Sequence, residues 1–212
     1  RTQTGSKYNN DVTKETSMNC LVYRPQIMTN QFKHVGEAAE LPIMVQDAPL
    51  SGVELSVPFL VRMAKSIEQV RYFKIETPGT ADKLRALIVA GGKNIEGPFD
   101  GEESITLMAD LNAGATGTMS SALLPDLIKT VVELHRVGQL EDAAKHYARI
   151  LPLINFENRQ CGLRACKVAM KEGGVIKSDY VRHPFPQMRP ETRAQLLELA
   201  NALDLVVLKW GR

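Results

Sequence analysis

The sequence predicts an α/β protein with a parallel sheet, and three observations support this fold class. Short apolar runs alternate with longer amphipathic segments between Leu41 and Gln139. Four such strand-helix units follow one another, and parallel strands joined in this way need right-handed crossovers. The chain has 212 residues, of which 44% are hydrophobic, and this is enough to bury one sizeable core. We expect either an open, doubly wound sheet or part of a barrel.

Each expected strand is a short apolar run that ends at polar, proline or glycine residues. The four strands are expected at 41–49, 70–76, 94–99 and 115–121. The helix after each strand carries its own signals, such as Ser56 as N-cap of the first and Gly138 as the end of the last. These helices are expected at 56–69, 79–92, 100–114 and 124–138.

The pattern changes after Gln139, where no further strand is expected. Residues 140–174 and 189–205 have helical patterns, and a proline-rich link, RHPFPQMRP, separates them. We therefore expect three parts: a polar leader (1–25), an α/β part (26–139) and a C-terminal helical extension (140–212).

Charge and cysteine content exclude several classes of protein. The 26 basic and 24 acidic residues give a net charge of +2 without a stripe of one sign, so neither nucleic acid nor a membrane surface is an expected partner. A small molecule is the expected partner. Cys20, Cys161 and Cys166 match no metal-ligand spacing and are expected to be reduced thiols. No membrane-length apolar run or secretory signal is visible, which predicts a cytoplasmic protein.

One lysine lies in an unusual place, because Lys74 falls within the apolar strand VRYFKIE. Side chains alternate along a strand, so Lys74 and Glu76 share a face near its C-terminal end. Their Cα atoms are expected about 7 Å apart along the strand. Active sites of parallel α/β folds lie at these ends. A lysine among apolar neighbours loses hydration, which favours the free amine that can attack a ketone. The alternative is an ordinary lysine on a solvated edge or in an ion pair.

The other polar candidates have structural interpretations. Asp100, Glu102 and Glu103 are expected to stabilise the start of a helix through its dipole. Asp82 and Lys83 are expected on a solvated helix surface. The histidines are isolated in sequence, and we expect neither a metal site nor a catalytic triad from them; they are His34, His135, His146 and His183.

Four segments, taken in order, resemble one enzyme family over roughly residues 26–212: LPIMVQDAPLSG, YFKIETPG, NIEGPFDGEES and ATGTMSS. The family is the class I aldolase superfamily that includes dihydrodipicolinate synthase and N-acetylneuraminate lyase. Its members are (β/α)8 TIM barrels with a helical C-terminal extension. The resemblance implies that the four segments are strands five to eight, with Lys74 as the Schiff-base lysine on strand six. It also implies a homo-oligomer.

Details of the segments look like the sugar-acid dehydratase branch, because Gln46 stands where the aldolases commonly have tyrosine. The resemblance implies a dehydratase (a lyase) that converts a 2-keto-3-deoxy sugar acid, with 2-keto-3-deoxy-L-arabonate as the expected one, to 2,5-dioxopentanoate. Glu76 would be the base and Gln46 would orient groups. Gly97 and Ser120 would bind substrate. No cofactor or metal is expected, since the substrate would be held covalently by Lys74.

Two alternatives stay open at this point. The first is an aldolase or synthase of the dihydrodipicolinate synthase type. The second is an inactive, truncated remnant, because the segments that match family strands one to four should precede residue 26, where we find only the polar leader 1–25.

Overall fold

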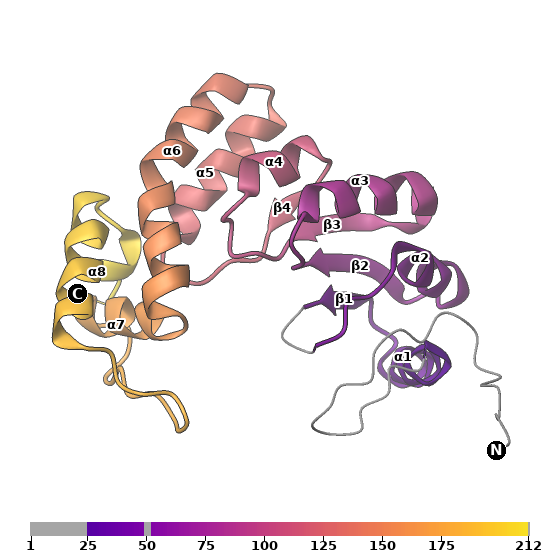
Figure 1. Cartoon of the computed structure of the whole chain (residues 1–212), viewed down its shortest axis with the longest axis horizontal. Coiled ribbons are helices and arrows are strands. Elements are labelled where there is room, and N and C mark those ends of the chain that lie inside the picture. Colours follow the sequence, from indigo (N-terminus) through magenta and orange to yellow (C-terminus); the bar gives the residue numbers. More distant parts are fainter. Residues whose placement is uncertain (1–24, 49–51, 212) are drawn as a thin grey trace, which may run out of the picture. The chain divides into compact units, whose positions relative to one another are not determined.

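A computed structural model describes residues 25–48 and 52–211 (Figure 1). The chain divides into two compact units, the first reaching Phe99 and the second beginning at Asp100, and each is described by itself. Among the described residues, no helix has the length and apolar character needed to cross a membrane.

The first unit contains three neighbouring strands with helices packed against them. Its order is α1 (Pro25–Ala39), β1 (Ile43–Asp47), α2 (Val57–Ser66), β2 (Val70–Ile75), α3 (Thr80–Gly91), a 3-10 turn (Gly92–Asn94) and β3 (Glu96–Asp100). The strands lie in the order β1-β2-β3, and β1 pairs with β2 in parallel. Helices α2 and α3 pack against β2 and against each other. The predicted α/β class with a parallel sheet is confirmed.

Strand alternation separates the two faces of β1 and β2. Val45, Phe73 and Ile75 are fully buried. They belong to one core with apolar residues of α2 and α3, namely Phe59, Leu60, Met63, Leu84 and Leu87. The alternate positions, among them Gln46 and Lys74, are less buried. Packing therefore uses one face and leaves the other for polar groups.

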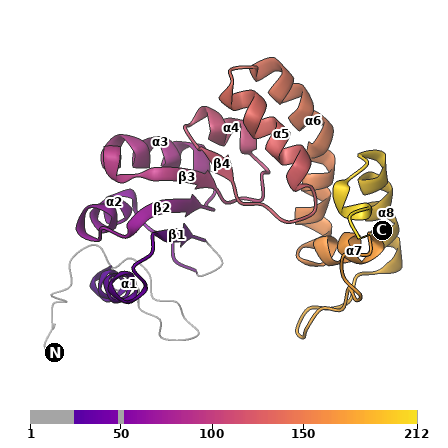
Figure 2. The same cartoon turned by 180° about the vertical axis from the view of Figure 1, so that it is seen from behind.

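The second unit is mostly helical. It contains α4 (Leu107–Asn112), β4 (Gly117–Thr118), α5 (Pro125–Arg136), α6 (Leu140–Phe156), a π-helical turn (Glu157–Cys161), α7 (Arg164–Glu172), α8 (Pro190–Ala202) and a final 3-10 turn (Val206–Leu208). Helices α5 and α6 pack along each other, and α8 packs against α6 and α7 (Figure 2). The amide of Met119, just after β4, donates to the carbonyl oxygen of Asp100 at 3.0 Å.

Several element predictions need correction. Helix α1 was not expected; it buries only Gly36, so its apolar pattern is weak. The expected helix at 140–174 is interrupted between Phe156 and Arg164, where Gly162 has a φ of +58° that ends the helical path. The two compact units meet at 99/100, and α5 packs on α6 within the second unit. The expected division into 1–25, 26–139 and 140–212 stays a prediction.

The expected acidic helix start at Asp100 is also wrong. Helix α4 begins only at Leu107, and Glu103 and Ser104 have positive φ values of 53° and 68°. Asp100 is fully buried and closes a turn, because its carboxylate accepts hydrogen bonds from the amide of Glu102 and the hydroxyl of Thr118, both at 2.8 Å. The carboxylate of Asp100 thus stabilises a loop and does not stand at the start of a helix.

The π-helical turn after α6 contains a buried acid, Glu157, which is 6% exposed. Burial raises the pKa of its carboxyl from 4.5 to about 7; a hydrogen bond with Ser121 acts against this, and the charge of Glu103 adds to it. The two thiols on this side of the unit, Cys161 and Cys166, are free, and burial raises the pKa of each. Cys20 lies outside the described residues.

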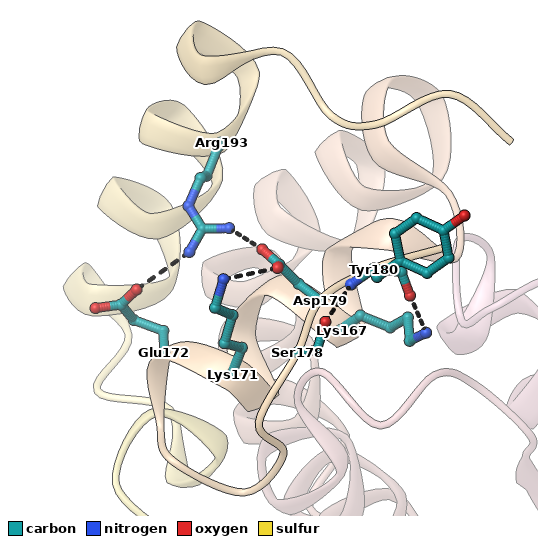
Figure 3. Close-up of polar contacts among 7 residues, drawn as sticks. All are labelled: Lys167, Lys171, Glu172, Ser178, Asp179, Tyr180 and Arg193. Atoms are coloured by element: carbon teal, nitrogen blue, oxygen red, sulfur yellow. Dashed lines mark hydrogen bonds and ion pairs between the residues drawn. The ribbon is translucent and has the colours of Figure 1, made fainter. Parts of the chain in front are cut away.

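Asp179 connects α7 with α8 across the segment between them (Figure 3). Lys171 donates to its carboxylate at 2.8 Å, and Arg193 donates to the other oxygen. Arg193 also pairs with Glu172 at 3.3 Å. The hydrogen bond from Lys171 is the largest cause that holds the pKa of Asp179 below 3.8; burial opposes it, and Arg193 adds to it. The charged cluster therefore fixes this segment to both helices.

Replacing Asp179 with Asn should lower the free energy of unfolding at pH 7 by about 1 kcal/mol, because two charge-assisted contacts lose their anion. A carboxyl with a lowered pKa stabilises the fold above about pH 3.8, and this stabilisation is lost as the pH falls through the native pKa. Urea titrations at pH 7 and pH 3.5 should show the difference shrinking in acid. The exposed Asp204→Asn change is the control, and an equal loss from both variants contradicts the prediction.

Replacing Glu157 with Gln should change how stability depends on pH. A carboxyl with a raised pKa disfavours the fold progressively as the pH rises from about 4.5 through about 7. Relative to the wild type, Glu157→Gln should gain up to about 3 kcal/mol between pH 4.5 and pH 8. Denaturation at both pH values measures this, with the exposed Glu198→Gln as control. A constant difference between wild type and variant would show that Glu157 is ionised normally.

Candidate active site

Lys74 lies on β2 on the face opposite the buried Phe73 and Ile75. Its side chain is only 13% exposed, and its Nζ lies 3.3 Å from Oε2 of Glu76, whose side chain is 19% exposed. The lysine therefore does not lie on a freely solvated edge, whereas its ion pair with Glu76 agrees with the other structural alternative as well as with the catalytic one. The two residues share a face, as strand alternation predicts.

Gln46 joins this pair from the neighbouring strand. The parallel register of β1 and β2 puts Gln46 opposite Lys74. The Gln46 side-chain amide donates from Nε2 to the same Oε2 of Glu76 at 2.6 Å. The three residues predicted to be catalytic thus meet at one carboxylate oxygen. The two contacts stabilise the Glu76 carboxylate and fix its orientation beside the Lys74 nitrogen. This geometry is suitable for moving a proton between the two groups.

The backbone after β2 fixes the position of Glu76. Its amide donates to the carbonyl oxygen of Asp47 at 3.0 Å, which extends the contact between the two strand ends. The buried Thr80 hydroxyl then donates to the carbonyl oxygen of Thr77 at 2.5 Å, where α3 begins. Glu76 is therefore held by a turn between a strand and a helix, and not by a long loop.

A buried ion pair lies on the opposite face of the sheet, between β1 and α3. Lys83 of α3 has its Nζ 2.6 Å from Oδ2 of Asp47 and 2.8 Å from Oε1 of Glu54. The side chain of Lys83 is 10% exposed and that of Asp47 is 0% exposed. The expectation that Lys83 lies on a solvated surface is wrong, whereas Asp82 is exposed as expected. The helical repeat could have predicted the burial of Lys83, because Lys83 is three residues after the buried Thr80 and four before the buried Leu87 and so lies on the same face of α3.

The two residues expected to bind substrate lie in different units. Gly97 is in β3 with a φ of +88°, and a Cβ at this position would lie 3.0 Å from the ring of Phe99. Backbone geometry is thus a sufficient reason for glycine at this position. Ser120 belongs to the second unit and follows β4, where it lines a cavity of about 600 Å³ together with Thr118, Lys129 and Arg136. Substrate binding by either residue stays a prediction.

Within 25–48 and 52–211, no three His, Cys, Asp or Glu side chains gather in a way that could hold a metal ion. His135 has a structural contact with Oδ1 of Asn112 at 2.9 Å.

A family model described as the dihydrodipicolinate synthetase family matches residues 12–203. The chain belongs to this family. The expected resemblance is thereby confirmed, and the matched range begins inside the leader 1–25 that we expected to lie outside the family.

Two curated relatives show how far the similarity extends. L-2-keto-3-deoxyarabonate dehydratase of Azospirillum brasilense is 58% identical over 180 residues, which are 85% of this chain and 58% of that protein. 4-Hydroxy-tetrahydrodipicolinate synthase 1 of Halalkalibacterium halodurans is 30% identical over 172 residues, 80% of this chain and 56% of the relative. This chain therefore spans less than two thirds of the length of either relative.

Solved structures support the same fold. The chloride-inhibited dihydrodipicolinate synthase of Acinetobacter baumannii, in a complex with pyruvate, matches with a TM-score of 0.76 at 22% identity. The match covers 87% of this chain and 62% of that protein. At this identity, the comparison shows that the described α/β arrangement is the family's fold over the matched part.

Proposed function

We propose that this chain carries the catalytic lysine and proton-transfer groups of a dehydratase that acts on 2-keto-3-deoxy-L-arabonate and yields 2,5-dioxopentanoate. The observation that carries this proposal is the shared contact of Lys74 and Gln46 with Glu76, on adjacent parallel strands. The 58% identity to a relative named L-2-keto-3-deoxyarabonate dehydratase supports the choice of substrate. The pyruvate complex of a solved relative supports a small 2-keto acid as ligand.

The fold supports a corresponding architecture. We propose that β1 to β4 are strands five to eight of a (β/α)8 barrel, with α6 to α8 as the helical extension. Lys74, Gln46 and Glu76 would then lie at the C-terminal ends of barrel strands, where such enzymes have their active sites. A homo-oligomeric state and a cytoplasmic location stay predictions from the sequence.

The first step would be attack of the Lys74 amine on the C2 ketone. The ammonium must lose a proton before it can attack, and Glu76 Oε2 at 3.3 Å is the adjacent acceptor. The carbinolamine then loses water to give the protonated Schiff base. This cation withdraws electrons from C3, so the C3 protons become acidic without a metal or organic cofactor.

Elimination would follow from the same groups. Glu76 removes a proton from C3, and the enamine expels the C4 hydroxyl as water, with the proton supplied by Glu76 or by a water molecule that Gln46 orients. Gln46 cannot itself act as a strong acid or base, because its side chain is an amide. Proton shifts move the new double bond toward C5, and hydrolysis releases 2,5-dioxopentanoate. The overall change is the loss of one water molecule.

A synthase or aldolase reaction is the second candidate, because the relative from Halalkalibacterium halodurans carries a synthase name. A single assay separates the two. From 2-keto-3-deoxy-L-arabonate, dehydration yields 2,5-dioxopentanoate, whereas retro-aldol cleavage yields pyruvate and glycolaldehyde.

Borohydride reduction of the chain in the presence of pyruvate should leave one reduced pyruvyl group on Lys74, because reduction makes a Schiff base permanent. Intact mass and a peptide map measure the adduct. Lys74→Ala should lose it, and Lys65→Ala, which changes an exposed lysine of α2, should retain it. Folded wild-type protein without an adduct would favour the inactive remnant and reject the proposal.

Glu76→Gln should lower the rate of dehydration by about 100-fold or more, because glutamine has the shape of glutamate but cannot accept a proton. Trapping of pyruvate on Lys74 should persist at long incubation but form more slowly, since the amine is still present and water must accept its proton in place of Glu76. Formation of 2,5-dioxopentanoate is the measurement. Turnover near the wild-type rate would remove Glu76 from the role of base.

A further inference from the structure

We propose that Asp47 and Lys83 form a positioning pair that holds Gln46 and Glu76 in line with Lys74. The inference rests on the proposed function for its catalytic consequence, but its structural content stands on the geometry alone. Lys83 Nζ lies 2.6 Å from Asp47 Oδ2, in a place where both side chains are almost completely buried. The contact of this pair with the cluster that carries the proposal runs through the backbone of Asp47.

Asp47 is connected to both polar neighbours of Lys74. It follows Gln46 directly in β1, and its carbonyl oxygen accepts the amide of Glu76 at 3.0 Å. Because side chains alternate along a strand, the carboxylate of Asp47 and the amide of Gln46 point to opposite faces of the sheet. A rotation of this strand end that moved the Asp47 carboxylate would therefore move the Gln46 amide as well.

Each oxygen of the Asp47 carboxylate has its own partner. Its Oδ1 accepts the backbone amide of Leu55 at 2.8 Å, which fixes the segment that returns toward α2. Its Oδ2 faces Lys83 on α3, and Lys83 also reaches Glu54 at 2.8 Å. The end of β1, the segment before α2 and the first turn of α3 are thus joined at one side chain.

The chemistry of the pair favours a positioning role over simple stabilisation. The surroundings on this face are apolar, with Val45, Ile75 and Leu84 fully buried. Two charges lose hydration in such surroundings, and an apolar pair of similar volume is often equally stable. The ion pair of Lys83 with Asp47 Oδ2, together with the hydrogen bond from the Leu55 amide to Oδ1, differs from apolar packing because it specifies direction and distance. Proton transfer between Lys74 and Glu76 depends on such geometry, and a displacement of about 1 Å can lower a catalytic rate by about 100-fold.

The test compares Lys83→Met with Lys83→Arg, which restores a cation, and with Lys65→Met, which changes an exposed lysine of α2. The first readout needs no catalysis: the NMR signals of the Gln46 side-chain amide, assigned by their loss in Gln46→Met, and the hydrogen exchange rate of the Glu76 amide. Lys83→Met should shift the Gln46 signals and speed Glu76 exchange by about tenfold or more. Lys83→Arg should restore both in part, and Lys65→Met should change neither.

The second readout is kinetic. Lys83→Met should lower kcat by about 10- to 100-fold while KM changes little, because the substrate still binds but the reacting groups are misaligned. Pyruvate should still be trapped on Lys74. A general loss of stability would not produce this division between kcat and KM.

The outcomes separate the two proposals. If wild-type protein forms no adduct with pyruvate, the proposed function fails, and the NMR comparison still decides whether the pair positions Gln46 and Glu76. If Lys83→Met folds with Gln46 signals and Glu76 exchange like those of the wild type, the positioning role is overturned. If Lys83→Met does not fold, the double variant Asp47→Asn/Lys83→Met removes both charges, and unchanged NMR signals in that variant overturn the role equally.

Discussion

In a parallel pair of strands, the backbone hydrogen bonds decide which side chains become neighbours, and the register of β1 on β2 makes neighbours of Gln46 and Lys74. Glu76 then reaches both, because it lies two residues after Lys74 on the same face. A slip of one residue would turn Gln46 toward the helices and bring Asp47 to the side of Lys74. The buried Val45 opposes this slip, because it would move from the core face to the polar face of the sheet. The apolar core therefore maintains the arrangement of the polar cluster.

One carboxylate oxygen serves both an ammonium and an amide before any substrate is bound. If a ketone reacts with Lys74, that nitrogen becomes part of the carbinolamine and its contact with Glu76 changes. The hydrogen bond from Gln46 can persist through this change, so Glu76 keeps its orientation while its ionic partner is altered. In the proposed mechanism, Gln46 would thus orient Glu76 and would not itself transfer a proton.

The shared face of Lys74 and Glu76 could be predicted because strand alternation is a short, local pattern, whereas Gln46 was indicated only by the family resemblance. The ion pair of Lys83 was missed, since a lysine near a helix start is usually solvated, and its partners Asp47 and Glu54 lie far away in the sequence. The turn at Asp100 was missed for a similar reason. Its partner Thr118 lies 18 residues away in the sequence, and no local pattern indicates that contact. Gly162 at least carried a signal, because a glycine within a long helical pattern is a common point of interruption.

Alternation along β2 also has a consequence for how such a protein can change over time. Phe73 and Ile75 are part of the buried core, whereas Lys74 and Glu76 face away from it. A substitution at an alternate position can thus alter the reaction without disturbing the packing on the other side. We expect Gln46, at the position where the resemblance implies a tyrosine in the aldolases, to be a difference of this kind. A family whose members carry both dehydratase and synthase names can diversify its chemistry on one face of a strand while the opposite face preserves the fold.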